Sequence, residues 1–269
     1  LPASVIINKK DDTGAALDGA EFTLYEDKGT VGTFEPGTDT AVSPTKKCTT
    51  SSGTCTISGI LPAGNYCVDE TVVPAGYNKA AAQCFSLALN QNRTLADFIN
   101  PRETGAIEIT KTRKHAAATD PANDPHSGVE FTITGGNLDV AGTKVTTNGQ
   151  GIACLEGLPL SSLAGVGDYT ATETVPENYV ADGDVAKTVT VSQSGTCSDG
   201  NAATVSFSNT PLTDISVSAT SLVSGGTKSS ISCKLGDTVV GSVGFTENPS
   251  LTLSNKVPET YVCTIVVDP

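Results

Sequence analysis

The sequence predicts an all-β protein made of tandem β-sandwich domains. Segments rich in Val, Ile, Thr, Tyr and Phe are short, and clusters of Gly, Asp, Asn, Ser and Pro separate them. No stretch keeps apolar residues at the helical spacing of i, i+3, i+4 and i+7. A length of 269 residues is sufficient for two or three domains, and the sequence repeats itself internally.

Four blocks of sequence recur in the same order and define two copies of one domain. Each block of the first copy has a counterpart in the second: residues 4–11 and 106–113, 19–24 and 128–133, 66–77 and 169–179, and 98–101 and 207–211. The repeats predict domains over residues 1–103 and 104–211. For residues 212–269, which are too few for a third full copy, we expect a small β module, either reduced or truncated.

The first strand of each copy carries a lysine among apolar residues. Side chains two residues apart share a face of a strand, so Lys9 lies on the same face as Val5 and Ile7. Lys111 has the same place in the second copy. By the same alternation Lys10 faces solvent, which makes it the weaker candidate for a reactive amine.

Two later strands carry an acid and an amide on their apolar faces. In the third block, alternation places Glu70 and its counterpart Glu173 in line with apolar side chains. In the last block, Asn100 shares a face with Phe98, and Asn209 has the same place in the second copy. If these faces form the core, each domain buries a Lys, a Glu and an Asn.

A buried group of this composition has two interpretations. Desolvation lowers the pKa of a lysine and raises the pKa of a glutamate, which leaves a neutral amine beside a protonated acid. The amine is then a nucleophile, and the acid can polarise the Asn carbonyl and shuttle protons. The product would be a Lys–Asn isopeptide bond, formed with loss of ammonia. The alternative is a plain buried salt bridge between Lys and Glu, with Asn as a hydrogen-bonding neighbour.

The blocks also carry a family resemblance over residues 4–211. The motifs are V-x-I-x-K in the first strand, G-A-E-F after it, Y-x-x-x-E-T-x-x-P-x-G-Y, and F-x-N followed by proline. Together they resemble the motifs of the Cna protein B-type, prealbumin-like domains of Gram-positive pilins and surface adhesins. The resemblance implies Ig-like sandwiches in an elongated tandem, with isopeptide bonds catalysed by the acid of the third motif. It assigns two sets of residues: Lys9, Asn100 and Glu70, and Lys111, Asn209 and Glu173.

The chain departs from the family pattern in two places. The third motif of the second copy ends in VPENY, without the usual glycine before tyrosine, a turn change that we expect to leave Glu173 undisturbed. In the third segment, alignment puts Ala219 at the lysine position and Ile265 at the glutamate position. We therefore expect no isopeptide bond in residues 212–269.

The eight cysteines predict disulfides rather than a metal site. Their count is even, no C-x-x-C occurs, and the chain has two histidines. The four cysteines of the first domain allow three connectivities, which the sequence leaves open. The pairs that we favour within each segment are Cys48–Cys55, Cys67–Cys84, Cys154–Cys197 and Cys233–Cys263. Disulfides indicate an oxidising compartment, so we expect a secreted or surface-displayed protein.

Composition argues against several classes of function. A net charge of −13 disfavours nucleic acid and anionic lipid as partners, and no apolar run is long enough to insert in a membrane. We find no hydrolase triad motif or phosphate-binding loop, and we expect neither a cofactor nor a resident metal. A metal site of His115, Asp120, Asp124 and His126 is a weak hypothesis, because these residues lie in a polar loop without fixed spacing.

These observations favour a structural protein whose chemistry is self-directed cross-linking rather than enzymatic turnover. We expect the shaft or stalk region of an adhesin or pilin on the cell wall of a Gram-positive bacterium, in contact with other surface or pilus subunits. No LPxTG sorting signal occurs, so the chain is interpreted as a fragment of a longer protein. The alternative is a module that binds a host matrix protein or glycan, which the low aromatic content of 5% disfavours for glycans.

Overall fold

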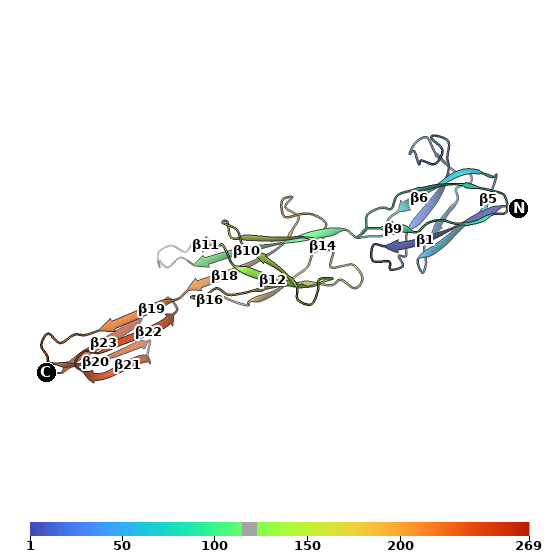
Figure 1. Cartoon of the computed structure of the whole chain (residues 1–269). Helices are drawn as coiled ribbons and strands as arrows, with labels where there is room; N and C mark the ends of the chain where they lie inside the picture. Colours follow the sequence, from blue (N-terminus) through green and yellow to red (C-terminus); the bar gives the residue numbers. More distant parts are fainter. Residues whose placement is uncertain (115–122, 269) are drawn as a thin grey trace. The chain divides into compact units, whose positions relative to one another are not determined.

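The computed structural model describes residues 1–114 and 123–268, which form strands and loops only (Figure 1). The all-β prediction is confirmed. Across these residues no helix has the length and apolar character needed to cross a membrane. Contacts divide the chain into two compact units, one of Leu1–Gly105 with Pro159–Val166 and Ser192–Ser194, and one of Ala106–Leu158, Gly167–Val191 and Gly195–Pro269.

The first sandwich contains two sheets that face each other across an apolar core. Its strands are β1 (Ala3–Asp11), β2 (Glu21–Glu26), β3 (Thr40–Ala41), β4 (Lys47–Thr49), β5 (Thr54–Ile60), β6 (Gly64–Val72), β7 (Gln83–Leu87), β8 (Asn92–Thr94) and β9 (Phe98–Asn100). One sheet has the order β5-β1-β8, with β9 also paired to β1, and the other has the order β3-β2-β6-β7, with β4 paired to β2. Residues from both sheets form one buried cluster.

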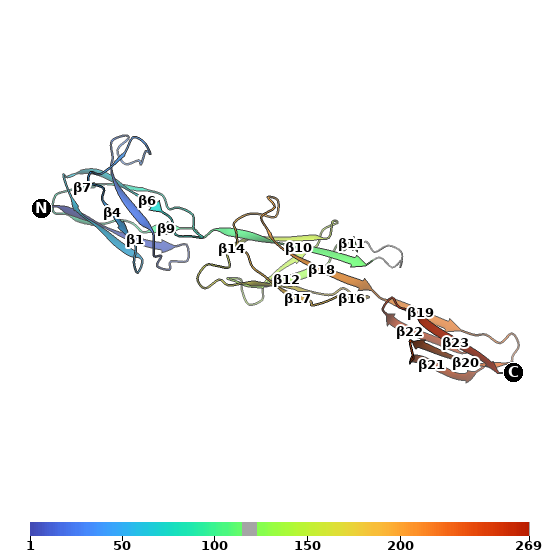
Figure 2. The same ribbon diagram turned by 180° about the vertical axis from the view of Figure 1, so that it is seen from behind.

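The second sandwich repeats this arrangement. Its strands are β10 (Thr104–Lys114), β11 (Asn123–Pro125), β12 (Glu130–Gly135), β13 (Thr143–Thr146), β14 (Ile152–Pro159), β15 (Tyr169–Glu173), β16 (Tyr179–Ala181), β17 (Ala186–Val189) and β18 (Ala203–Pro211). The sheets run β11-β10-β18-β16, with β14 paired to β10, and β13-β12-β15-β17. In both sandwiches the last strand lies parallel to the first, β9 along β1 and β18 along β10 (Figure 2).

The third segment contains strands that match only the first part of this topology. They are β19 (Thr213–Ser218), β20 (Lys228–Leu235), β21 (Thr238–Thr246), β22 (Ser250–Lys256) and β23 (Tyr261–Asp268). β19 pairs with β22 as β1 pairs with β5, and β20 pairs with β21 and β23 as β2 pairs with β4 and β6. Among the described residues no strand lies parallel to β19 as β9 does to β1. Ala219 follows the end of β19, and Ile265 is 42% exposed.

On β1 and β10 the strand faces follow the predicted alternation, whereas on β6 the consecutive residues Tyr66–Glu70 are all buried. β1 alternates strictly between buried and half-buried residues, and Lys9 lies on the buried face with Val5 and Ile7. Lys111 has the same position on β10. Lys10 faces outward and forms an ion pair of 2.7 Å with Asp97 at the surface. The lysines predicted to be buried are therefore fully enclosed, with no exposed surface.

Four disulfides lie within the described residues, and all but Cys154–Cys197, in which Cys197 lies in a turn, join two strands. The bonded pairs are Cys48–Cys55, Cys67–Cys84, Cys154–Cys197 and Cys233–Cys263. Cys67 and Cys84 lie directly opposite each other on the neighbouring strands β6 and β7, and Cys233 faces Cys263 in the same way on β20 and β23. All eight cysteines are used, so none is a free thiol.

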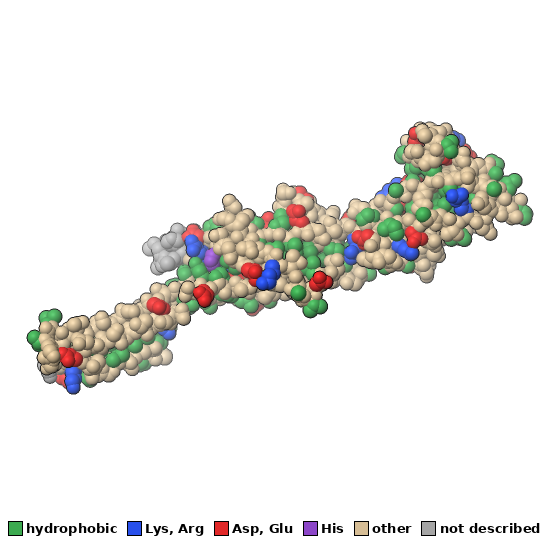
Figure 3. Space-filling view, in the orientation of Figure 1, with side chains coloured by type: hydrophobic (Ala, Val, Ile, Leu, Met, Phe, Trp, Pro, Cys, Tyr) green, Lys and Arg blue, Asp and Glu red, His purple; other side chains and the backbone are tan. Residues whose placement is uncertain are grey.

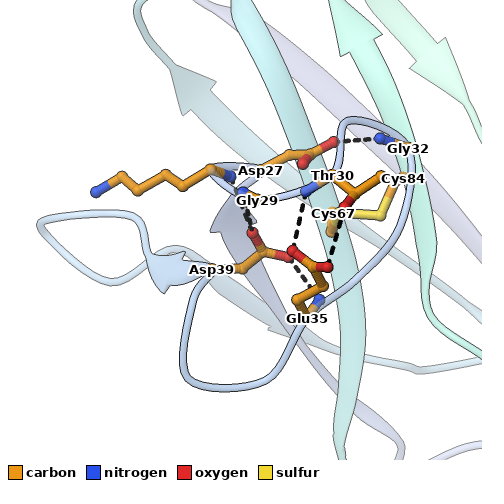
Figure 4. The surroundings of a disulfide bond; sticks show 9 residues. Asp27, Gly29, Thr30, Gly32, Glu35, Asp39, Cys67 and Cys84 are labelled. Atoms are coloured by element: carbon orange, nitrogen blue, oxygen red, sulfur yellow. Dashed lines mark hydrogen bonds between the residues drawn. A yellow bond between two sulfur atoms is a disulfide. The ribbon is translucent and has the colours of Figure 1, made fainter.

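Acidic side chains organise the loop that follows β2, next to the Cys67–Cys84 disulfide (Figure 4). The carboxylate of Asp39 accepts hydrogen bonds from the backbone N–H groups of Glu35 at 2.8 Å and Lys28 at 2.9 Å. These bonds hold the pKa of Asp39 below its usual value, because they favour the charged form. Asp27 closes the loop by accepting a bond of 2.7 Å from the backbone of Gly32.

Charged side chains are dispersed on the surface. On the face seen in Figure 3, acidic and basic groups lie singly or in small adjacent groups among hydrophobic and uncharged side chains. The ion pairs within the described residues are mostly exposed, as in Lys28–Glu26 and Lys144–Glu130. Such pairs contribute little to stability, so the polar contacts that matter most for folding are the buried ones.

Candidate isopeptide sites

The first site joins residues from both sheets of the first sandwich. Lys9 on β1 lies opposite Phe98 on the parallel strand β9, and Asn100 follows two residues later on the same face. Glu70 reaches them from β6 in the facing sheet, and its Oε1 accepts a hydrogen bond of 2.8 Å from Asn100 Nδ2. Lys9 Nζ donates to the backbone carbonyls of Lys10 at 2.9 Å and Phe98 at 3.2 Å. At 1% exposure or less, Lys9, Glu70 and Asn100 are isolated from solvent.

The second site places the same three residue types in the same register, but its lysine amine contacts the acid, whereas Lys9 Nζ donates to backbone carbonyls. Lys111 on β10 lies opposite Phe207 on β18, and Asn209 follows on the same face. Asn209 Nδ2 donates a hydrogen bond of 2.6 Å to Glu173 Oε1, and Lys111 Nζ lies 3.3 Å from the same oxygen. One carboxylate oxygen thus lies between the amine of the lysine and the amide nitrogen of the asparagine.

This geometry fits proton transfer by the glutamate better than polarisation of the asparagine carbonyl. An oxygen that contacts both Lys111 Nζ and Asn209 Nδ2 can accept a proton from the amine and deliver it to the departing nitrogen. The expected contact between the acid and the Asn carbonyl is not formed, since Oδ1 of Asn100 and of Asn209 has no hydrogen-bond partner among the described residues. The arrangement therefore favours proton transfer by the glutamate over polarisation of the carbonyl.

A pair of phenylalanines encloses each site, which the sequence pattern did not indicate as functional. Phe22 lies opposite Glu70 in the strand pairing, and its ring contacts that of Phe98 with centroids 4.7 Å apart. Phe131 and Phe207 repeat the contact in the second domain at 4.9 Å. Apolar rings beside the polar groups exclude water, so charges in the site are poorly solvated. The signal was present in the sequence as the F of G-A-E-F and of F-x-N.

Burial changes the protonation of both lysines. Desolvation lowers the pKa of Lys9 and of Lys111, and the negative charges of Glu70 and Glu173 offset only part of that effect. A larger fraction of each amine is therefore neutral at a given pH than for a solvated lysine. Neutral amine is the nucleophilic form, so the core activates these two lysines for attack on a neighbouring amide.

Cross-linking should therefore depend on pH. In chain isolated unfolded from inclusion bodies and then refolded, we expect bond formation to slow as the pH falls, because protonated Lys9 and Lys111 cannot attack. Mass spectra taken at intervals between about pH 5 and pH 9 would give the rates, with circular dichroism as the control for folding. A rate that stays constant across this range in folded protein would contradict activation by burial.

The weak metal hypothesis receives no further support. His115 and Asp120 lie outside the described residues. His126 is buried, and its ring packs against Tyr179 with centroids 4.5 Å apart. The same burial lowers the pKa of His126, so the ring is a neutral core side chain.

Comparison with protein families assigns the first domain to a family. Residues 3–100 match the family model described as SpaA, prealbumin-like fold domain. The first domain is a SpaA-type prealbumin-like domain. The second sandwich pairs its first and last strands in the same parallel sense as this SpaA-type domain, and its Lys, Glu and Asn occupy the same register positions.

One solved structure shows a similar fold, two pilins match with lower scores, and no curated protein sequence matches the chain. The Bacillus anthracis TIE protein is 19% identical with a TM-score of 0.55, and the match covers 98% of this chain and 48% of that one. The shaft pilin SpaA from Lactobacillus rhamnosus GG is 17% identical (TM-score 0.34, 78% of this chain and 99% of that one). The minor pilin GBS52 from Streptococcus agalactiae is 16% identical (TM-score 0.32, 78% and 97%). The chain thus spans about half the length of the TIE protein structure.

Proposed function

We propose that the chain is a shaft or stalk region of a pilin or adhesin on the surface of a Gram-positive bacterium, and that each sandwich domain cross-links itself by a Lys–Asn isopeptide bond. The observation that carries the proposal is the pair of buried sites in which a glutamate oxygen contacts the amide nitrogen of an asparagine beside a buried lysine. The SpaA match of residues 3–100 supports the surface location and suggests other pilus subunits as partners.

The proposed reaction needs only groups of the chain. The neutral amine of Lys111 attacks Cγ of Asn209, and Glu173 takes up the proton that the amine loses. The glutamate returns this proton to Nδ2, the Cγ–Nδ2 bond breaks, and ammonia leaves. The new Nζ–Cγ amide bond joins β10 to β18, and Glu173 ends in its starting state. Lys9, Asn100 and Glu70 carry out the same steps in the first domain.

Each domain reacts once, so the protein is not an enzyme in the sense of turning over a substrate. The buried setting favours the reaction, because folding brings the groups together and holds them without competing water. A salt bridge alone would leave a lysine fully enclosed with few compensating contacts, which is costly. Formation of a neutral amide removes that cost permanently.

The mass of the intact protein tests the proposal. After reduction of the disulfides, we expect a mass below the sequence mass by two ammonia molecules. Tryptic digestion should yield two branched peptides, one containing Lys9 and Asn100 and one containing Lys111 and Asn209. A mass equal to the sequence mass, with both lysines in linear peptides, would refute the cross-links and leave the salt-bridge interpretation.

A further inference from the structure

A polar side chain crosses from one sheet toward the other at the same edge of each sandwich. Lys187 on β17 lies opposite Ala171 on β15, and Gln83 on β7 lies opposite Val68 on β6. Ala171 and Val68 have no exposed surface, and residues paired directly opposite each other share a face of the sheet. Lys187 and Gln83 therefore point to the core side of their strands, and each of these strands ends the order of its sheet.

Both side chains reach the chain that leads into the motif F-x-N. Lys187 Nζ donates a hydrogen bond of 2.6 Å to the backbone carbonyl of Ser206, and Gln83 Nε2 donates one of 3.0 Å to that of Ala96. Each acceptor lies one or two residues before the phenylalanine of F-x-N. Two different residue types thus make the same kind of contact between the sheets, which we call the cross-sheet bridge.

In the second domain the cross-sheet bridge also covers a wall of the cross-linking site. Lys187 Nζ lies 4.7 Å from the centre of the Phe207 ring, within the range of a cation–π contact. Phe207 is 4% exposed, packs on Phe131 and lies opposite Lys111 in the strand pairing. Lys187 itself is half-buried, so its apolar stem contributes to the cover over this ring while its charged end meets solvent. Loss of the side chain would open Phe207 to water beside Lys111.

Water at this wall would change the protonation of Lys111. Burial is the largest influence on this amine and lowers its pKa, whereas the charges of Glu173 and Asp182 raise it. The charge of Lys187 adds to the lowering of this pKa, but its effect is smaller than that of burial. The charged or titratable groups that act on Lys111 come from four segments and are Glu173 on β15, Asp182 after β16, Lys187 on β17 and His126 after β11. A solvated Lys111 would be protonated to a larger extent and would attack more slowly.

We propose that Lys187 and Gln83 are positioning residues of the cross-linking reaction. Each holds the strand of the reacting asparagine against the facing sheet through its cross-sheet bridge, and Lys187 also keeps water away from the Phe207 wall of the second site. Their contacts are with backbone carbonyls and the Phe207 ring, so they act through the strand rather than on the reacting atoms. This inference rests on the proposed cross-linking reaction.

Substitutions at position 187 test the cross-sheet bridge in the second domain. Lys187→Ala removes it, and Lys187→Gln keeps it in the form found in the first domain. Each full chain is refolded between about pH 5 and pH 9, and the branched peptide of Lys111 and Asn209 is followed by mass spectrometry. For Lys187→Ala we expect the bond to form roughly tenfold more slowly at pH 7, with the pH–rate curve displaced by about one unit to higher pH. For Lys187→Gln we expect a rate close to that of wild type, because the amide can donate the same hydrogen bond.

Substitutions at position 83 give the matching test in the first domain. Gln83→Ala should slow formation of the Lys9–Asn100 bond at least roughly threefold, and Gln83→Lys should form it at a near-normal rate. In each variant the unaltered domain of the same chain is the internal control. Lys144→Ala, which removes an exposed ion pair of 2.7 Å with Glu130 in the second domain, should change neither rate.

Circular dichroism, recorded on every refolded variant, separates folding from bond formation. If Lys187→Ala does not fold, Lys187→Thr replaces it, since threonine suits a strand and is too short to reach Ser206. A variant that is folded but slow, with its pH–rate curve displaced, shows an effect on the reaction beyond stability.

The outcomes separate the two proposals. Slow bond formation in Lys187→Ala and in Gln83→Ala, with near-normal rates in Lys187→Gln and Gln83→Lys, supports the positioning role. Equal rates in Lys187→Ala and wild type, or equal slowing by Lys187→Ala and Lys187→Gln, overturn that role and leave the cross-links intact. A slower rate without displacement of the pH–rate curve overturns the exclusion of water by Lys187. No ammonia loss in the wild type overturns the proposed function itself.

Discussion

Replacement of Glu70 by Gln should leave Lys9 and Asn100 unlinked and make the first domain much less stable. The introduced amide fills the same space as the carboxylate but cannot move a proton from Lys9 to the departing nitrogen. A link across a loop of roughly 90 residues restricts the unfolded chain by about 4–5 kcal/mol, and this contribution would be lost. Apart from the mass change of the substitution itself, intact mass should rise by one ammonia relative to wild type, and denaturant unfolding should show the first domain unfolding earlier.

The second domain and a surface variant are the controls for this experiment. The branched peptide of Lys111 and Asn209 should be unchanged in Glu70→Gln. Glu26→Gln removes an exposed carboxylate that pairs with Lys28 at 2.9 Å, and it should change neither mass loss nor stability appreciably. A Lys9–Asn100 branched peptide recovered in normal yield from Glu70→Gln would show that the acid is not required.

Removal of the Cys233–Cys263 disulfide should unfold the third segment. Its buried core consists of Ile231, Cys233 and Leu253, whereas the first sandwich buries a much larger apolar cluster. A disulfide that spans this separation of 30 residues contributes about 3–4 kcal/mol, which is comparable with the whole stability that so small a core provides. In the variant with Cys233→Ser and Cys263→Ser, we expect rapid proteolysis confined to residues 212–269.

The Cys48–Cys55 pair supplies the matched control. It spans 7 residues and belongs to the large core of the first sandwich, so replacing both cysteines by Ser should leave the fold intact. Limited proteolysis followed by mass spectrometry distinguishes the two variants. Persistence of an intact 212–269 segment in the Cys233→Ser, Cys263→Ser variant would show that its strands stay folded without the disulfide.

Much of each site was predictable because strands have a simple period. Once a strand is assigned, alternation decides which side chains share a face, and Lys9 and Lys111 follow directly from their apolar neighbours. The repeat strengthened the prediction, since the same three residue types occur in the same order twice. The same alternation holds at Asn100 on β9 and at Glu173 on β15, whereas Glu70 lies in a run of five buried residues on β6.

The features that could not be predicted from the sequence depend on contacts between strands and loops. Glu70 Oε2 accepts a hydrogen bond from the backbone N–H of Ala80, a contact that no side-chain pattern reveals. In the second domain the equivalent backbone N–H, that of Asp182, donates to Ser208 instead, because the residues after the VPENY turn pair with β18. The side-chain pattern did not predict this pairing. Disulfide connectivity in the first domain stayed open until the sheet placed Cys67 opposite Cys84.

The parallel pairing of first and last strands has a mechanical consequence. When a chain is pulled at both ends, two parallel neighbours that begin and end a domain slide past each other along their length. Their hydrogen bonds are then loaded together in shear, which resists rupture better than opening one bond at a time. The register is continuous over seven residues, Ile107 to Arg113, in the second domain, whereas in the first it is divided between β8, at Ser4 to Ile6, and β9, at Lys9 to Asp11. Before any covalent link forms, the second domain should thus be the stronger element under tension.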